Sequence, residues 1–599
     1  MKRRLLYLLK TYGLTVLLFV AAKVAFVGCN GTGHGLTAGD WTDVIGHGLS
    51  LDLSTALYFL IVPLLAVLAS VWARVPAVVL KVYFAIVALA LALAFVADTS
   101  LYPFWGFKLD ASCLQYLSQP EGITQSVTTG YLLLRCLLVA LLTVLFYWLY
   151  SRPRTLFPCR TGRTLRLRLA ETALYVALMP LMVVGIRGGL SESTTNIGQV
   201  YYSQNQFLNH AAVNPVFSFL YSAGHQLGDL SQYDFFDEAE CLRLTEQVYT
   251  TESIGGDTLL TTQRPNIVII LLESCGEEFA HVMPHLQALK QEGISFSRCY
   301  GNSWRTDRGT VCVLSGYPSF PSLSVMKMPE KSRTLPGIAS TLQAQGYKTS
   351  YLYGGDINFT NMRSYLIATG WQRLTSMDDY GSDDRHSAQW GVRDDITFAT
   401  LFNQITTAGE PFLMGYSTLS SHEPWDVPGR RQADEVLNAF AYLDDCLYDF
   451  INNVRETPAW DNLLLVLTAD HGINYKQIDQ SRPQEKNHIP MLWLGGAVRE
   501  PRTVDVICNQ SDLAATLLGQ LGLPHDDFAF SRDVLSQTYV YPTAVHNYSN
   551  AQWLADSTGH VLYDFDLRRI IVSQGSDTER LIAVSKAMVQ RTIGDLQQR

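Results

Sequence analysis

The sequence has few charged residues, no paired cysteine motif and no excess of basic side chains. Only 17% of its 599 residues are Asp, Glu, Lys or Arg, and the net charge is −9. This balance gives no indication of a nucleic-acid partner. The ten cysteines include no Cys-x-x-Cys pair and no metal-type spacing, and the chain contains no internal repeat or low-complexity tract. Cysteine-based zinc sites and repeat architectures are therefore excluded.

Long apolar runs are present instead, and all of them lie in the first 190 residues. They raise the mean hydropathy to +0.09, which is high for a soluble enzyme. Five segments are long and apolar enough to cross a bilayer, at about 20 residues each. These are roughly 5–27, 52–73, 76–97, 131–150 and 169–187. Lys10 and Lys23 interrupt the first, and no small-residue cleavage site clearly follows it, so we expect a membrane span and not a signal peptide.

Basic residues are distributed unevenly among the loops between these segments. They occur at the N-terminus, between the second and third segments, and six times as arginine between residues 152 and 168. The opposite loops, 28–51 and 98–130, contain one basic residue, Lys108. The positive-inside rule therefore predicts a cytoplasmic N-terminus and places everything after residue 190 outside.

From residue 265 onward, apolar strand patterns alternate with helical patterns. The expected strands are 266–272, 294–299, 347–353, 411–417 and 462–468, and the expected helices are 280–292, 334–345, 393–407, 432–455 and 511–522. Such alternation predicts a mostly parallel sheet with helices on both faces. The tail adds strand-like segments at 538–546, 561–565 and 569–573 and a polar helix at 576–597, which we interpret as an antiparallel extension.

The predicted fold class is thus a multi-span α-helical membrane domain followed by an α/β domain. We expect a five-helix transmembrane domain at 1–190, an amphipathic connector and linker at 191–262, and a catalytic domain at 263–599. The oligomeric state is left open by the sequence.

Four residues carry the chemistry that this α/β domain could perform. Glu273 ends the first expected strand, and Asp470 and His471 follow the apolar run 463–467. Strand ends of this kind form the ligand-binding edge of an α/β sheet, and carboxylates with an imidazole suit a divalent cation. Thr306 supplies a hydroxyl that becomes a useful nucleophile when a metal lowers its pKa. The set suits transfer or hydrolysis of a phosphate or sulfate ester, although each residue alone could be a helix cap or turn residue.

These motifs resemble those of the alkaline phosphatase and sulfatase superfamily, and most closely its lipoteichoic acid synthase and phosphoglycerol transferase group. Sulfatases carry Cys-x-Pro-Ser-Arg-x-x-x-Leu-Thr-Gly around the nucleophile. Here Thr306 stands at the cysteine position, ten residues before Gly316 of Leu314-Ser315-Gly316. A threonine does not become formylglycine, which disfavours the sulfatase mechanism. The resemblance implies that Glu273, Thr306, Asp470 and His471 hold one manganese-like ion, with zinc or magnesium as alternatives, and that Thr306 is the nucleophile.

The resemblance also implies substrate contacts. Asp356 and Arg363 match a substrate-binding Asp and Arg, and His422 matches a histidine that faces the phosphoryl group. His488 stands where sulfatases keep a basic residue, but it could equally be a residue at the start of a strand. Arg308 flanks the nucleophile, and its alternative is a salt bridge with Asp307.

The chain also departs from the synthase pattern. Asn361 replaces a Trp, Gly354 and Gly355 stand where a His is expected, and Arg305 and Arg308 replace a Lys and a short polar residue. These departures leave the identity of the transferred head group open, but they do not change the residues expected to carry the phosphoryl chemistry.

The expected function is that of a phosphotransferase in the bacterial cytoplasmic membrane. It would move a phosphoglycerol-type head group from a membrane phospholipid to a glycan or lipid acceptor through a phosphothreonine. The alternatives are a phosphoethanolamine transferase, a phosphatase or sulfatase-type hydrolase, and a sensor or scaffold built on an inactive enzyme fold.

Overall fold

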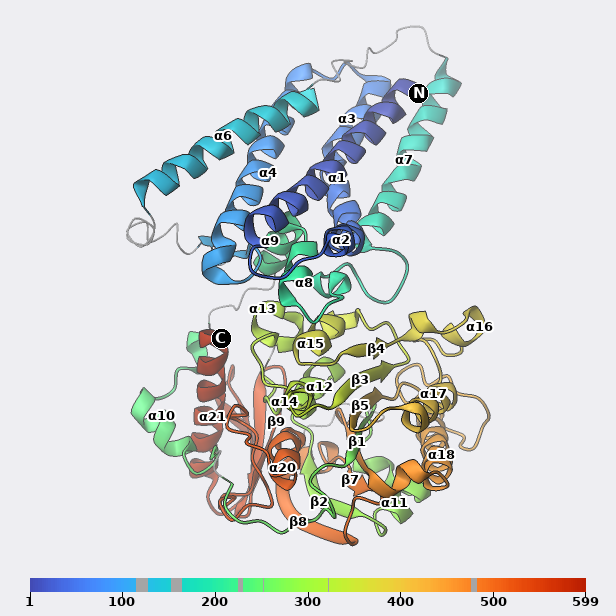
Figure 1. Ribbon diagram of the computed structural model, residues 1–599, viewed down its shortest axis with the longest axis vertical. Helices are drawn as coiled ribbons and strands as arrows, with labels where there is room; N and C mark the ends of the chain where they lie inside the picture. Colours follow the sequence, from blue (N-terminus) through green and yellow to red (C-terminus); the bar gives the residue numbers. More distant parts are fainter. Residues whose placement is uncertain are drawn as a thin grey trace. The chain divides into compact units, whose positions relative to one another are not determined.

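The computed structural model describes residues 1–111, 113–114, 128–151, 164–224, 230–250, 253–321, 323–473, 475 and 482–599 (Figure 1). The chain divides into two compact units, Met1–Gln226 and Leu227–Arg599. The expected connector 191–262 is therefore shared between them. Four arginines of the basic loop, Arg152, Arg154, Arg160 and Arg163, lie outside the described residues.

The first unit consists of helices. They are α1 (Lys2–Asn30), α2 (Ala38–Tyr58), α3 (Ile61–Trp72), α4 (Ala77–Trp105), α6 (Thr129–Ser151), α7 (Leu165–Arg187), α8 (Gln206–Ala212) and α9 (Pro215–Gly224). Within the described residues, four helices are long and apolar enough to cross a membrane, and the pair α2–α3, bent by 42°, makes up to five. The expected segment 52–73 includes the end of α2 and all of α3. It begins later than the bent pair because the first part of α2 is more polar.

Charged residues inside this unit are paired. Lys23, which interrupts the first apolar run, forms a fully buried ion pair with Asp52, and the Asn214 side chain donates to the same carboxylate at 2.8 Å. Lys108 pairs with Asp98 in the same way. Buried charges are tolerated when they are paired and hydrogen-bonded. These pairs explain how strongly polar residues fit among the apolar helices.

The second unit is built on an eight-stranded sheet with the order β4-β3-β5-β1-β6-β7-β2-β8. Its strands are β1 (Asn266–Leu272), β2 (Ile294–Tyr300), β3 (Lys348–Tyr353), β4 (Arg373–Thr375), β5 (Phe412–Ser417), β6 (Leu463–Ala469), β7 (Met491–Leu494) and β8 (Arg502–Asn509). All pairings are parallel except those of β7, which runs antiparallel to β6 and β2. The mostly parallel sheet predicted from the sequence is confirmed.

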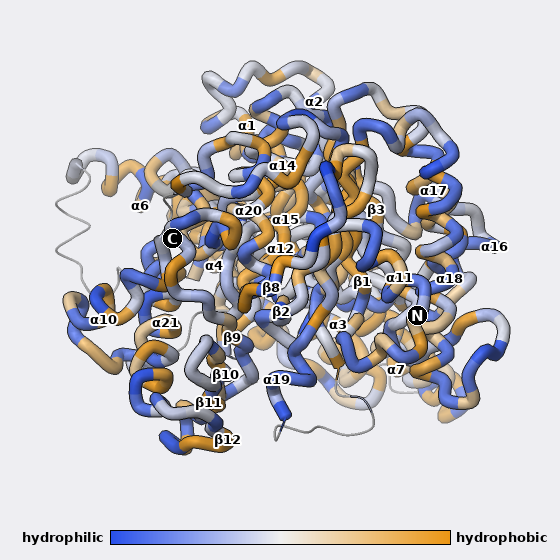
Figure 2. Tube along the Cα trace, turned by 90° about the horizontal axis from the view of Figure 1, so that it is seen from below, coloured by the Kyte–Doolittle hydropathy of each residue, from blue (hydrophilic) through white to orange (hydrophobic). Residues whose placement is uncertain are grey.

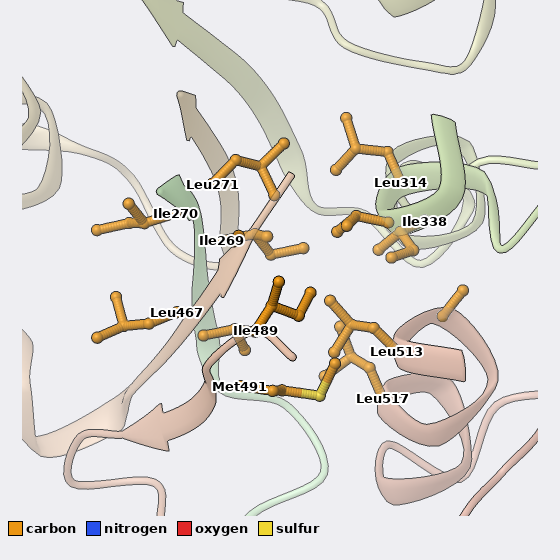
Figure 3. Packing of buried hydrophobic residues seen from close by; sticks show 14 of the residues in the cluster. Ile269, Ile270, Leu271, Leu314, Ile338, Leu467, Ile489, Met491, Leu513 and Leu517 are labelled. Atoms are coloured by element: carbon orange, nitrogen blue, oxygen red, sulfur yellow. The ribbon is translucent and has the colours of Figure 1, made fainter. Parts of the chain in front are cut away.

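Helices cover both faces of this sheet. On one face, Leu314 of α12 (Thr306–Ser315), Ile338 of α14 (Ile338–Ala344) and Leu513 of α20 (Leu513–Gln520) pack toward Ile269 and Leu271 of β1 (Figure 3). Ile270 and Leu467 point to the opposite face.

On that opposite face, Phe398 of α17 (Asp394–Thr407) contacts both Tyr416 of β5 and Phe450 of α18 (Glu435–Arg455). The short α19 (Pro483–Lys486) is coloured hydrophilic (Figure 2). Because both faces are buried, β1 reads as a continuous apolar run without alternation.

One expected helix is wrong. The segment 280–292 is divided into a 3-10 helix, Glu277–Val282, and α11 (Pro284–Leu289). Pro284 starts α11 because proline has no backbone N–H and suits the first position of a helix.

A second, antiparallel sheet with the order β12-β11-β10-β9 follows the first. It comprises β9 (Thr543–Asn547), β10 (Ala551–Asp556), β11 (Gly559–Asp564) and β12 (Arg569–Gly575), with α21 (Thr578–Gln598) after it. Strand β10 was not anticipated from the sequence. The backbone N–H of Asn547 at the end of β9 donates to the carbonyl of Asn302 at 2.9 Å. The C-terminal sheet therefore holds the loop that leads into α12.

Candidate active site

Thr306 is the first residue of α12, and its hydroxyl lies at the carboxyl edge of the large sheet. The hydroxyl donates to Glu273 Oε2 at 3.2 Å and lies 3.4 Å from His471 Nε2. Backbone N–H groups at a helix N-terminus favour anions, so a phosphoryl group next to this hydroxyl would face a favourable field.

Glu273 follows β1 directly and is 3% exposed. Its position is fixed through the backbone: its N–H donates to the Thr418 hydroxyl at 2.9 Å, and its carbonyl accepts from the Ser421 hydroxyl at 2.6 Å. The next residue, Ser274, adopts a left-handed conformation with φ of 58° and donates from its hydroxyl to Glu273 Oε1 at 2.8 Å. The sharp turn after β1 therefore directs the carboxylate toward Thr306.

Asp470 and His471 directly follow β6, the neighbour of β1. One oxygen of Asp470, Oδ1, accepts from the N–H groups of Ser274 and His471 at 2.9 and 2.8 Å. Its other oxygen, Oδ2, is buried and accepts no hydrogen bond from any described donor. His471 Nδ1 donates to the Gly472 carbonyl at 2.9 Å, which leaves the Nε2 lone pair facing Glu273 and Asp470.

These three residues fit a divalent metal ion. Ligand atoms of Glu273, Asp470 and His471 lie within 4.8 Å of one another, and all three side chains are buried. A buried carboxylate oxygen without a donor is costly unless a cation satisfies it. Hard oxygen ligands with one imidazole suit manganese, zinc or magnesium.

The pKa values of Asp470 and His471 also reflect buried carboxylates that lack a counter-charge. Burial and the neighbouring Glu273 carboxylate raise the pKa of Asp470 to about 7. Burial lowers the pKa of His471, but the carboxylates of Asp470 and Glu273 outweigh it and leave that pKa above its ordinary value. Two carboxylates brought together without a counter-charge behave in this way.

Arg308 lies two residues after Thr306 in α12 and, among the described residues, forms no ion pair with Asp307. Its guanidinium donates to the Phe320 carbonyl at 3.0 Å and stacks over Trp304, while Asp307 pairs with Lys327 at 3.2 Å. The exposed Arg305 stacks on the same Trp304 ring. The structure therefore does not contain the salt bridge between Arg308 and Asp307 that was the alternative.

Asp356 and Arg363 are joined through Asn358. The Asn358 N–H donates to Asp356 Oδ1 at 3.0 Å, and Arg363 Nε donates to Asn358 Oδ1 at 2.8 Å. Burial lowers the pKa of Arg363, and the nearby Asp378 and Asp356 counteract that shift. The structure thus brings both expected substrate contacts into one polar cluster.

His422 is partly exposed and lies in the loop after β5. Its Nδ1 donates to the Glu423 carbonyl at 2.7 Å, and its ring packs against Trp390 with centroids 4.7 Å apart. The buried Asp394 holds this loop by accepting from the N–H groups of Leu419 and Ser420 at 2.8 and 3.0 Å.

His488 is directed elsewhere. Its Nε2 donates to the Ser297 carbonyl of β2 at 2.9 Å, and its ring lies against Tyr300. Among the described contacts, none links this ring to Thr306. These contacts favour the alternative considered from the sequence, in which His488 is a residue that leads into a strand.

Sequence reasoning missed several residues that shape the site. Asp394, Gln510 and His546 are all buried and contact segments that carry site residues. His546 Nδ1 donates to the Gly301 carbonyl at 2.7 Å in the loop before Thr306. No motif marks these side chains, because their partners are distant in the sequence.

Comparison with known proteins agrees with this geometry. The sulfatase family matches residues 265–523. Phosphoglycerol transferase I of Xanthomonas axonopodis pv. citri (strain 306) is 24% identical over 307 residues, which cover 46% of this chain and 43% of that protein. Phosphoglycerol transferase I of Shigella flexneri is 24% identical over 288 residues, covering 43% and 37% respectively. The chain thus spans less than half the length of these curated relatives.

Solved structures show the same fold. A protein in the alkaline phosphatase superfamily from Vibrio parahaemolyticus superposes with a TM-score of 0.54 at 26% identity, covering 61% of this chain and 98% of that one. The lipoteichoic acid synthase LtaP from Listeria monocytogenes gives 0.50 at 17% identity, covering 60% and 98%. Residues 265–523 therefore form a sulfatase-family domain with the fold of the alkaline phosphatase superfamily, and in this region the chain is similar to phosphoglycerol transferase I.

Proposed function

We propose that this protein is a membrane-anchored, metal-dependent phosphotransferase. It moves a phosphoglycerol-type head group from a phospholipid to a glycan or lipid acceptor through a phosphothreonine at Thr306. The observation that carries the proposal is the placement of the Thr306 hydroxyl between Glu273 Oε2 and His471 Nε2, at the start of a helix.

In the first half-reaction, Thr306 Oγ1 attacks the phosphorus of the head-group phosphodiester. A bond forms between that oxygen and phosphorus, and the bond from phosphorus to the diacylglycerol oxygen breaks. The Thr306 proton passes to Glu273 Oε2, the oxygen that accepts its hydrogen bond before the attack. His422 has its Nδ1 bound to the Glu423 carbonyl, so its Nε2 is the nitrogen that would protonate the leaving alkoxide.

In the second half-reaction, an acceptor hydroxyl attacks the phosphothreonine. His422 Nε2 takes the acceptor proton, the bond between phosphorus and Thr306 Oγ1 breaks, and the threonine recovers its proton from Glu273. Glu273, Thr306, Asp470 and His471 would hold the divalent ion, manganese by preference with zinc or magnesium as alternatives. Such an ion lowers the pKa of the threonine hydroxyl and offsets charge on the phosphoryl oxygens.

Substrate recognition falls to the polar residues around this centre. Arg363 and Asp356 would bind the head group, and an arginine suits a phosphodiester through paired hydrogen bonds. Arg308 would add positive charge behind the nucleophile. His488, with its Nε2 engaged by Ser297, contributes only through the backbone in this proposal.

The membrane helices serve a lipid substrate directly, because a donor in the bilayer diffuses in the same plane as the enzyme. We place the N-terminus in the cytoplasm and the sulfatase domain outside a bacterial cytoplasmic membrane. The asymmetric distribution of Lys and Arg among the loops supports this orientation.

Intact-mass measurement tests the proposal. The detergent-solubilised full chain is incubated with manganese and either phosphatidylglycerol or phosphatidylethanolamine, with Thr306→Ala as control. We expect a mass gain of one phosphoglycerol group with the first lipid, absent in the control. A gain only with phosphatidylethanolamine would make the protein a phosphoethanolamine transferase. No adduct, with free head-group phosphate released, would make it a hydrolase.

A further inference from the structure

Gln510 is a fully buried side chain that touches three segments of the active site at once. It follows β8 and starts a short 3-10 helix, and it is 0% exposed. Its Oε1 accepts from the Asn302 N–H at 2.7 Å. Its Nε2 donates to the Asp470 carbonyl at 2.7 Å and lies 3.3 Å from the Gly309 carbonyl.

Each of these partners belongs to a segment that carries a proposed site residue. Asn302 lies in the loop that leads to Thr306, Gly309 lies in α12 just after Thr306, and Asp470 is a proposed metal ligand. The Gly309 backbone packs directly on the Asp470 carbonyl, with no room for a side chain between them. The Gln510 amide therefore forms hydrogen bonds to both the segment of Thr306 and the segment of Asp470, at the point where these two segments contact each other.

We propose that Gln510 is a positioning residue that sets the location of the Thr306 hydroxyl relative to Asp470 and His471. The inference rests on the proposed function, because it assigns a role to Gln510 in the placement of that nucleophile. Only a carboxamide of this length offers an acceptor to Asn302 and a donor to Asp470 together. A methionine fills the same space but leaves both backbone groups buried without a partner.

The chain contains a matched control in Gln520, at the end of α20. It is 8% exposed, its Oε1 accepts from the Leu259 N–H at 2.7 Å, and its Nε2 donates to the Asp257 carbonyl at 2.9 Å. Gln520 thus makes the same two kinds of bond, but to a segment that carries no proposed site residue. Each substitution removes one bond from a backbone N–H and one bond to a backbone carbonyl. Only Gln510→Met also removes the contact with Gly309 and disturbs the loop that leads to Thr306.

The experiment compares Gln510→Met and Gln520→Met in the detergent-solubilised full chain. The rate of phosphoglycerol transfer from phosphatidylglycerol gives kcat and KM, titration with manganese chloride gives the metal affinity, and thermal unfolding gives Tm. For Gln510→Met we expect kcat to fall about 10- to 100-fold and manganese affinity to fall about tenfold, with KM changed less than about threefold. For Gln520→Met we expect a similar loss of Tm with kcat and manganese affinity within about twofold of wild type.

Equal effects of the two variants on kcat and manganese affinity, at equal loss of Tm, would overturn the inference. If Gln510→Met does not accumulate, Gln510→Asn takes its place. It keeps an amide in the buried site but is too short to reach Asn302 and Asp470 together, and the same criteria apply. If the wild-type protein forms no Thr306 adduct, the proposed function fails, while the manganese affinities of the variants still decide the role of Gln510.

Discussion

The carbonyl oxygen of Asp470 lies against the backbone of Gly309, so closely that a Cβ atom on the glycine would overlap it. Helix α12 therefore meets the end of β6 through main-chain atoms. The segment with the proposed nucleophile and the segment with the proposed metal ligands therefore contact each other directly at this point, and the Gln510 amide bonds to both. A glycine is required there by this close approach.

Gly309→Ala should separate the two segments. We expect a loss of at least about 2 kcal/mol in the free energy of unfolding, because a buried methyl group must displace backbone. We also expect loss of transfer activity. Chemical denaturation and a transfer assay measure both effects.

Gly594→Ala is the control for that substitution. Gly594 lies in α21 with nothing within 4 Å of its Cβ position. It should gain about 0.5–1 kcal/mol from helix propensity. Equal stability of Gly309→Ala and the wild-type protein would contradict the close approach.

Metal removal should destabilise the sulfatase domain, because Glu273 and Asp470 then face each other without a counter-charge. We expect chelator treatment to lower Tm, and Asp470→Asn to weaken binding of the ion by at least about tenfold. Calorimetric titration with manganese, zinc and magnesium salts measures the affinity and identifies the preferred ion. The control is Asp505→Asn, a carboxylate that is 70% exposed on β8. Undiminished binding by Asp470→Asn would remove this residue from the ligand set.

His422→Ala should slow transfer by about 100-fold or more while leaving manganese affinity unchanged, because its proposed role is proton transfer. The measurement is steady-state transfer kinetics beside a metal titration. His281→Ala is the matched control, since the exposed His281 also donates from Nδ1 to a backbone carbonyl, that of Glu278. A His422→Ala enzyme with wild-type kcat would assign the proton transfer to another group.

His546 should make the stability of the domain depend on pH. Burial lowers the pKa of its imidazole to about 3, so the ring stays neutral in the folded protein. The unfolded chain binds that proton near its ordinary pKa of about 6.5. The contribution of His546 to the free energy of unfolding should therefore fall by about 1.4 kcal/mol per pH unit from about 6.5 down toward 3.

Tm measured at pH 7.5, 6.5 and 5.5 tests this dependence. In His546→Gln the decline should be shallower than in the wild-type protein, and in the exposed-residue variant His281→Gln it should be retained. An unchanged slope in His546→Gln would show that this imidazole is not the source.

Local sequence patterns were sufficient for the central strands and for bringing together Glu273, Asp470 and His471. Strand β1 was predicted with its observed bounds because it is an uninterrupted apolar run buried on both faces. Glu273 and Asp470 could be placed together because neighbouring parallel strands end at one edge of a sheet. The four-residue β7 escaped prediction because so short a run carries no period.

Gln510 and His546 could not be predicted for a different reason. A glutamine after a strand is compatible with a surface turn, and a histidine within a strand is compatible with either face. Their roles follow from partners about 200 residues away in the sequence, which no local pattern encodes.

The bond from His546 to the Gly301 carbonyl spans 245 residues. During synthesis, the loop before Thr306 leaves the ribosome long before the strand that holds it. The loop before Thr306 therefore lacks this hydrogen bond until β9, near the C-terminal end of the sequence, has been synthesised.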